Sequence, residues 1–538
     1  MTKKWLASWV LVALLPLAAQ AGGADKPAAV VRVRSLDTLV DNVKLLVALA
    51  GREEIAKQVE GLIKAKIGGQ GLEGIDPTRP LGVYARFGKE LDDVAGAILI
   101  PIADERTFLG LLENLNYKAV KGKGDIYNVQ AGAPVEIYLR FANRYAYVTA
   151  LNASAIEGQL PDPVQVLGKD GPTFAATVNL DRLPEAARQI AIAQIEQGLH
   201  DLSGKKIPGE TPGQQAIRTA ATKEFARAAV GVLKDGGAVS LTIDLSAKTK
   251  ELSASISLAG KDGTELARTI QNLGQEKSLF GGLRSGTAFR GLTHVILPDE
   301  LKKGFGKVLD DGAAKAVADI SDPSKRQQAQ QLLDVLLPTL KTGELDGCVQ
   351  LLGSGADGKY AVVAGVKVKD GVKLGNKLQE LLTDAIKQMP EAQRARIQLN
   401  HASAGAVKIH RFELPADQTT VRELQKHFGE TNLYVAFKDD AALFAMGADS
   451  LTKLKDIIAN PATGASPLFL YELDFARLAP MLAPTEELRA AAKKIFPDGQ
   501  DGLVRLSLEG GASLRLSLTT RLAVVQFLSQ LRAMKVGE

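Results

Sequence analysis

Apolar side chains follow two different periods along this chain. Between residues 36 and 50 they recur at the helical period of 3.6 residues, which predicts an amphipathic helix. Residues 81–87 and 94–102 form short apolar or alternating runs, which predict strands. Short turns separate later pairs of runs, such as 433–437 and 441–446, so we expect largely antiparallel sheets with helices packed on one face. The expected fold class is α+β.

The same order of strand and helix signals occurs twice. A strand-like run, then an Asp, then a Leu and the start of a helix recur at four places: Asp37, Asp181, Asp299 and Asp474. Matching strand and helix signals lie between the first and second places, and again between the third and fourth. We therefore expect an internal duplication, with similar α+β halves at residues 22–285 and 286–538. The glycine-rich segment 281–286 would join them.

The four Asp residues could be mistaken for a catalytic set. A carboxylate at a helix start accepts hydrogen bonds from free backbone N–H groups and interacts favourably with the helix dipole. Their recurrence at corresponding places favours this capping role. We therefore predict that they are structural.

The N-terminus has the features of a signal peptide. Lys3 and Lys4 precede an apolar run over residues 6–19, and Ala19-Gln20-Ala21 forms a small-residue cleavage site. The run is short for a membrane-spanning helix, which needs about 20 residues. No Cys follows it, so a lipoprotein anchor is not expected. We predict that residues 1–21 are removed and that the protein is periplasmic or secreted; an uncleaved anchor or a buried helix is the alternative.

Composition limits the possible functions. Cys348 is the only cysteine, so no intramolecular disulfide can form, and 46% hydrophobic residues supply enough apolar material for at least two cores. The formal net charge is +5 over 538 residues, with no long basic run. Nucleic-acid binding and electrostatic docking to a membrane are therefore not expected, nor is an integral membrane segment after signal cleavage.

Two glycine-rich segments resemble nucleotide-binding motifs. Residues 69–74 match G-x-G-x-x-G, but a helix precedes them and a strand follows, the reverse of the order that a dinucleotide site needs. Residues 353–360 differ from a P-loop at Tyr360, where Ser or Thr would bind magnesium. We interpret the first as a helix end and the second as a hairpin turn. No cofactor is expected.

Three segments resemble the motifs of serine enzymes. Ser203 with Lys206, Ser450 with Lys453, and Lys341-Thr342-Gly343 resemble the motifs of penicillin-binding proteins and β-lactamases. The order along the chain is wrong, since Ser450 follows Lys341. We interpret Ser450 as a helix N-cap.

Histidine and cysteine give no clear site either. None of the five histidines has a second His or a Cys at helical ligand spacing. His401 and His410 could face each other across a hairpin as metal ligands, but solvent-facing strand positions are the simpler interpretation. Cys348 begins an apolar run over 348–352 and is expected in a core. We therefore predict no catalytic, cofactor-binding or metal-binding residue.

Residues 74–84 read Gly-Ile-Asp-Pro-Thr-Arg-Pro-Leu-Gly-Val-Tyr. Together with the strand–Asp–Leu–helix openings and the tandem halves, this segment resembles a group of exported bacterial proteins of unknown function, common in planctomycete-type bacteria. The resemblance spans most of the chain after the signal peptide. It implies the tandem architecture and assigns no site residue.

These observations favour an exported, non-enzymatic binding or structural protein whose partner is an unknown protein or a small apolar ligand. Helices rich in Leu, Val and Ala suggest a carrier of apolar molecules, although a large aliphatic core is the simpler and favoured explanation. The alternative class is an extracytoplasmic hydrolase whose site assembles from residues distant in sequence.

Overall fold

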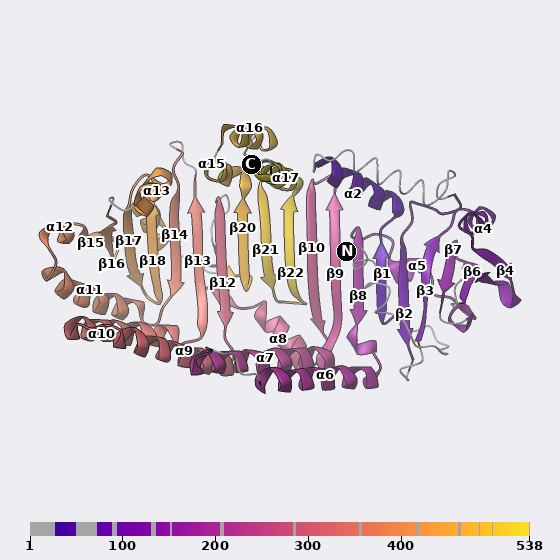
Figure 1. The fold of residues 1–538 in the computed structure, drawn as a ribbon, viewed down its shortest axis with the longest axis horizontal. Coiled ribbons are helices and arrows are strands. Elements are labelled where there is room, and N and C mark those ends of the chain that lie inside the picture. The colour runs from indigo at the N-terminus through magenta and orange to yellow at the C-terminus, as the bar shows by residue number, and fades with distance from the viewer. Residues whose placement is uncertain are drawn as a thin grey trace. The chain divides into compact units, whose positions relative to one another are not determined.

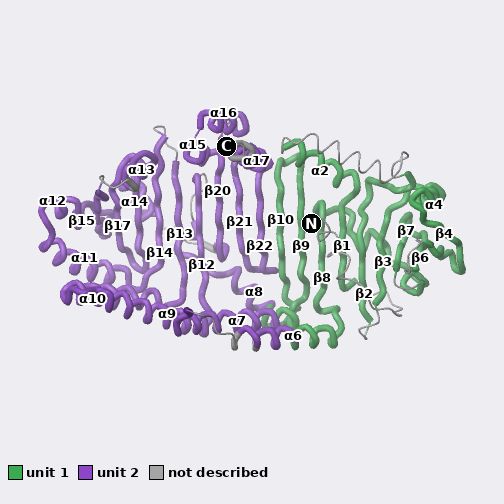
Figure 2. The backbone as a smooth tube through the Cα atoms, in the orientation of Figure 1, with its two compact units in different colours: residues 1–193, 232–266 green, residues 194–231, 267–538 purple. Residues whose placement is uncertain are grey.

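The computed structural model describes residues 27–49, 73–88, 94–130, 136–150, 153–204, 209–282, 287–353, 358–415, 419–460, 464–483, 485–497 and 499–536. The predicted signal peptide, most of the 69–74 motif, the join at 283–286 and Lys206 lie outside them. The chain divides into two compact units (Figure 2). Unit 1 comprises residues 1–193 and 232–266, and unit 2 comprises residues 194–231 and 267–538.

Unit 1 contains one antiparallel sheet. Its strands lie in the order β10-β9-β8-β1-β2-β3-β7-β6-β5-β4. The strands are β1 (Ala29–Val33), β2 (Leu81–Phe87), β3 (Val94–Pro101), β4 (Lys118–Lys121), β5 (Ile126–Gln130), β6 (Ile137–Ala142), β7 (Tyr145–Thr149), β8 (Phe174–Asn179), β9 (Gly236–Ser246) and β10 (Glu251–Gly260).

Unit 2 also contains a large antiparallel sheet. Its strands lie in the order β22-β21-β20-β12-β13-β14-β18-β17-β16-β15, and the short strands β11 (Lys277–Ser278) and β19 (Gly464–Ala465) pair separately. The large sheet consists of β12 (Phe289–Ile296), β13 (Glu344–Leu352), β14 (Ala361–Lys367), β15 (Ile397–Ala404), β16 (Val407–Glu413), β17 (Asn432–Lys438), β18 (Ala441–Gly447), β20 (Phe469–Asp474), β21 (Leu503–Glu509) and β22 (Leu514–Arg521).

Helices connect and flank these strands (Figure 1). The first part of the chain carries α2 (Leu36–Leu49), α4 (Glu105–Asn114), α5 (Pro163–Leu167), α6 (Glu185–Gly204) and α7 (Pro212–Asp235). The remainder carries α8 (Glu265–Leu273), α9 (Asp299–Ala318), α10 (Pro323–Leu340), α11 (Gly371–Lys387), α12 (Glu391–Arg394), α13 (Thr419–Phe428), α14 (Ser450–Ala459), α15 (Phe475–Leu482), α16 (Glu486–Ile495) and α17 (Leu522–Val536).

Mixed helices and antiparallel sheets confirm the α+β prediction, but the expectation of helices on one face is wrong. In unit 2, α14 packs beside Leu443 and Ala445 of β18, whereas α11 packs against Ala442, with Phe444 beside it. Successive strand residues point to opposite faces, so the two helices cover opposite sides of β18. The reason lies in residues 441–446, which are apolar at every position and therefore need cover on both sides.

The unit 1 sheet is also covered on both faces. Phe108 and Leu111 of α4 pack with Leu139 of β6 and Ala146 of β7. Leu167, the last residue of α5, belongs to a different cluster that includes Tyr147 of β7. Since Ala146 and Tyr147 point to opposite faces, this sheet too is covered on both sides.

The predicted capping role is confirmed for one of the four Asp residues. Asp474 accepts hydrogen bonds from the backbone N–H groups of Ala476 and Arg477 at the start of α15. Asp37 lies inside α2, whose first turn is held by the Ser35 hydroxyl. Asp181 lies in a 3-10 turn, and Asp299 is the first residue of α9, after Pro298. In these three cases the helix starts before the Asp or uses another residue as its cap.

Candidate functional site

One face of β13 carries a row of chemically different side chains. Glu344, Asp346, Cys348, Gln350 and Leu352 alternate along this strand and therefore point to the same side of the unit 2 sheet. This strand starts four residues earlier than the apolar run 348–352 indicates, because pairing with β12 extends to Glu344. The extension brings two carboxylates onto the sheet.

An apolar cavity of about 490 Å³ lies over this row. Cys348, Gln350 and Leu352 of β13 line its floor, and Ile457 of α14 lies in its wall. Its rim carries both signs of charge, with Lys438, Lys453, Asp439, Asp440 and Asp456. The cavity therefore has a mainly aliphatic interior and a polar mouth.

Gln350 is the exception in this interior. Its residue is 4% exposed, and its Nε2 has no hydrogen-bond partner among the described residues. A buried amide without a partner costs about 1–3 kcal/mol, and such groups in native structures call for an explanation. The cavity thus contains a hydrogen-bond donor that an occupant could satisfy.

A short segment closes one side of the cavity. This strap, residues 277–282, contributes Leu279, Phe280 and Gly282 to the lining. Asp346 holds it in place: Oδ1 accepts from the Ser278 hydroxyl at 2.5 Å, and Oδ2 accepts from the Leu279 backbone N–H at 2.8 Å. The Ser278 hydroxyl oxygen also accepts from the Phe280 backbone N–H. One buried carboxylate therefore fixes the strap that forms the wall.

The strap also depends on a glycine. A Cβ on Gly365 of β14 would lie 2.5 Å from Cε1 of Phe280 and 3.0 Å from Cδ2 of Leu443. The missing side chain leaves room for the Phe280 ring against the sheet. Packing of the strap thus requires glycine at this strand position.

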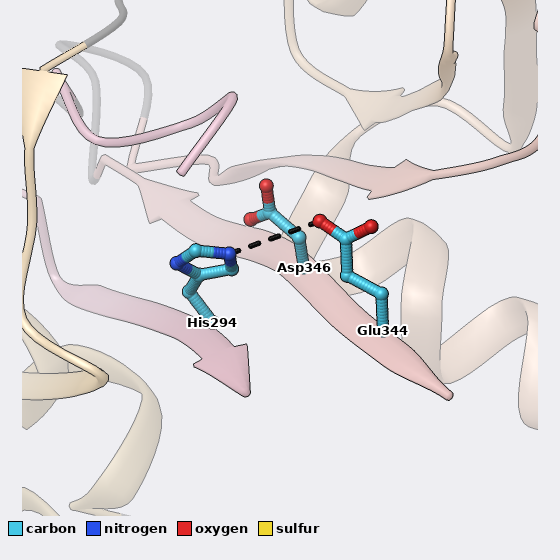
Figure 3. Close-up of side chains that lie close together, drawn as sticks. All are labelled: His294, Glu344 and Asp346. Atoms are coloured by element: carbon cyan, nitrogen blue, oxygen red, sulfur yellow. Dashed lines mark ion pairs between the residues drawn. The ribbon is translucent and has the colours of Figure 1, made fainter. Parts of the chain in front are cut away.

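Three ionisable side chains converge beside the strap (Figure 3). His294 of β12 lies directly opposite Asp346 in the strand register, and Glu344 precedes Asp346 by two residues on the same face. Figure 3 shows the imidazole and both carboxylates pointing towards one another, and one possible ligand atom from each lies within 4.8 Å of the others. His294 Nε2 is 3.8 Å from Glu344 Oε1, which is too long for a hydrogen bond.

Lys367 of β14 adds a positive charge beside this cluster. Its Nζ lies 2.5 Å from Glu344 Oε1 and neutralises that carboxylate. Asp346 is 2% exposed and receives only neutral donors from the strap. The cluster therefore contains one carboxylate paired with a cation and one that is not.

Cys348 is the only thiol and lies on the cavity floor. Burial raises its pKa to about 12, so the thiol is protonated at neutral pH. A thiolate is the nucleophilic form of cysteine. This residue is therefore a packing group, in agreement with its expected place in a core.

The structure separates the other residues considered for chemistry. His401 is exposed and bonds Gln398, whereas His410 is buried and accepts from the Asn400 backbone N–H. Each histidine thus has its own local partner, and they do not belong to a group of three metal-ligand residues among the described residues.

Ser450 does not cap its helix through its side chain. It is the first residue of α14, after Asp449, and is 0% exposed; its hydroxyl has no hydrogen-bond partner in the part of the chain that the structure describes. Lys453 donates instead to the Ala448 carbonyl, and Lys341 pairs with Asp310. These residues do not form a serine–lysine pair.

No protein-family model, curated protein or solved structure matches this chain. Of the helices in the described ranges, none has the length and apolar character that crossing a bilayer requires.

Proposed function

We propose that this chain is an exported, non-enzymatic binding protein that holds an apolar small molecule in the unit 2 cavity. The carrying observation is the Gln350 amide, buried in a largely aliphatic cavity, whose Nε2 has no hydrogen-bond partner among the described residues. Ligand pockets typically measure about 300–1,000 Å³ and combine apolar walls with a few polar groups that orient the ligand. A cavity of about 490 Å³ that contains the Gln350 amide matches this description.

The chemistry of the cavity defines the ligand class. Aliphatic and aromatic walls favour a hydrocarbon or aromatic body, and the Gln350 N–H group requires an acceptor such as a carbonyl oxygen. The mixed charges of the rim do not favour an anionic or a cationic headgroup. The expected ligand is therefore an uncharged, largely apolar molecule that carries a carbonyl.

Two observations support a binding role over hydrolysis. The Ser450 hydroxyl has no hydrogen-bond partner among the described residues, whereas a serine nucleophile needs an adjacent base. The Cys348 thiol, with its pKa of about 12, is protonated near neutral pH. Neither side chain has the environment of a nucleophile, which favours the binding role.

Internal duplication and export belong to the same proposal. When the ten strands of each large sheet are numbered in chain order, both sheets read 10-9-8-1-2-3-7-6-5-4. This shared order supports a duplication. For export, we expect protein recovered from the extracytoplasmic fraction to begin at Gly22; a chain that retains Lys3 and Lys4 would contradict cleavage.

Ligand binding is tested with Prodan, a fluorescent naphthalene that carries one ketone, added to the mature full-length protein. We expect saturable binding at one site with a blue-shifted emission. Gln350→Met keeps the side-chain length but removes the donor, so it should weaken binding about tenfold. Gln398→Met, at an exposed position on β15, is the matched control and should bind as the wild type does. Absent binding, or equal affinities for the wild type and Gln350→Met, would refute the proposal.

A further inference from the structure

The His294 side chain has an unusual environment for a buried imidazole. The residue is 3% exposed, and neither ring nitrogen makes a hydrogen bond to a described residue: Nδ1 has no partner, and Nε2 is 3.8 Å from its closest carboxylate oxygen. Either neutral tautomer therefore leaves a polar nitrogen unsatisfied inside the protein. Buried polar groups are rarely left in this state unless they serve a purpose.

The Nε2 atom points towards the carboxylates of Glu344 and Asp346 (Figure 3). Glu344 and Asp346 lie on the neighbouring strand, and the three possible ligand atoms are within 4.8 Å of one another. A tetrahedral cation bound about 2.1 Å from each ligand would separate them by about 3.4 Å. The observed 3.8 Å between Nε2 and Oε1 of Glu344 is close to that separation.

Both carboxylates remain able to bind a cation. Each oxygen of Asp346 accepts one hydrogen bond from the strap, which orients the group and leaves further lone pairs. The Glu344 side chain is 27% exposed, so the cluster can be reached from solvent. Lys367 occupies Oε1 of Glu344 and supplies a positive charge at the place where a cation would bind.

We propose that His294, Glu344 and Asp346 form a binding site for a divalent transition metal of the Zn²⁺ class. One imidazole nitrogen and two carboxylate oxygens form a three-ligand set that leaves a fourth position for water. Calcium and magnesium do not fit, since they prefer six or more oxygen ligands and rarely use imidazole. The proposal is independent of the ligand cavity, because His294, Glu344 and Asp346 are not among the residues that line it.

The site also has a built-in competitor. The Lys367 ammonium group neutralises Glu344 when no metal is bound, and it repels an approaching cation. Removing this charge should therefore strengthen metal binding, while removing a ligand should weaken it. Opposite effects from two neighbouring substitutions separate a metal site from a general loss of structure.

The experiment titrates Zn²⁺ into the tag-free mature protein, previously treated with chelator, by isothermal calorimetry. We expect one Zn²⁺ per chain for the wild type, at least tenfold weaker binding for His294→Gln and Glu344→Gln, and severalfold tighter binding for Lys367→Met. His401→Gln removes an exposed histidine and should bind as the wild type does. Bound Co²⁺ should show the visible absorption of a four-coordinate site, and His294→Gln should remove it.

Either Zn²⁺ binding that is unchanged in His294→Gln and weakened in His401→Gln, or no binding in the wild type, rejects the site. Circular dichroism in the presence of chelator checks that each variant folds. If His294→Gln does not fold, Lys367→Met decides alone: affinity equal to or below that of the wild type rejects the site. Prodan binding is measured separately, so failure of either proposal can be distinguished from failure of the other.

Discussion

The Ser278 hydroxyl donates a hydrogen bond to Asp346 Oδ1, with 2.5 Å between the two oxygens, and this bond joins the strap to one face of β13. The donor belongs to β11 and the acceptor is 68 residues later in the chain. Both residues are buried, so the strap is held by a charge-assisted bond that is shielded from water.

The first prediction concerns this bond. Ser278→Ala removes one donor from a buried carboxylate and should lower the free energy of unfolding by about 1–3 kcal/mol. Urea unfolding monitored by circular dichroism measures it. Ser517→Ala, at a partly exposed position on β22, should change the free energy of unfolding by less than about 0.5 kcal/mol. Equal effects from the two substitutions would show that the strap bond contributes little.

The second prediction compares two glycines. Gly365→Ala places a Cβ 2.5 Å from the Phe280 ring, so it should destabilise the protein by about 1–3 kcal/mol. Gly306→Ala, in α9 with open space around the new Cβ, should stabilise it by about 0.5–1 kcal/mol. Urea midpoints for both variants test the opposite signs. A neutral Gly365→Ala would mean that the strap moves away at no cost.

The third prediction concerns the unpartnered amide. Gln350→Met removes a buried polar group that bonds no described residue, so it should raise the free energy of unfolding without ligand by about 1–2 kcal/mol. The same substitution should weaken Prodan binding. Urea unfolding with and without Prodan separates the two effects. Destabilisation in the ligand-free state would contradict the assignment of Gln350 as an unsatisfied donor.

The fourth prediction follows from the Cys348 thiol. Burial raises its pKa to about 12 from an ordinary value of 9.0, so the unfolded chain loses this proton at lower pH than the folded protein does. Its contribution to stability is therefore complete below about pH 9 and is lost as the pH rises towards 12. Cys348→Ala should flatten this part of the stability profile. In the folded wild type at neutral pH, iodoacetamide should react far more slowly than in guanidinium; equal rates would contradict the thiol's protection.

The fifth prediction concerns acid. Burial lowers the pKa of His410 below its ordinary value of 6.5, and the nearby Lys408 adds to the effect. The unfolded chain therefore takes up this proton at higher pH than the folded protein, so stability should fall as the pH drops below about 6.5. His410→Gln should reduce the difference in urea midpoint between about pH 8 and about pH 5. His401→Gln is the control, and an equal reduction there would contradict the assignment.

Much of the secondary structure could be predicted from apolar periodicity. The run 81–87 matches β2, and the helical period at 36–50 matches α2. The cluster of His294, Glu344 and Asp346 could not be predicted in this way, because the two carboxylates interrupt the apolar pattern. They lie in a strand only because β12 supplies backbone partners up to Ile296. A Glu-x-Asp pair just before an apolar strand was the available signal, but its partner His294 is about fifty positions away.

The cover on both faces was also missed for a physical reason. An uninterrupted apolar run such as 441–446 indicates burial on both sides, but it does not say which helices provide it. The capping predictions for Asp37, Asp181 and Asp299 failed for a different reason. An Asp near a helix start is one of several possible caps, and Ser35 took that place for α2.

The position of β12 in its sheet has a consequence for the order of folding. Its two neighbours are β13, which follows soon in the chain, and β20, which is synthesised much later. Until β20 and its hairpin partners are available, one edge of β12 has unpaired backbone groups. Pairing β12 with β20 closes a long loop, and the entropy cost of that closure comes before the contacts between the two strands can offset it. This slows folding. Until β20 pairs with it, the free edge of β12 can pair with strands of other chains. Aggregation during synthesis is therefore the main risk for this sheet.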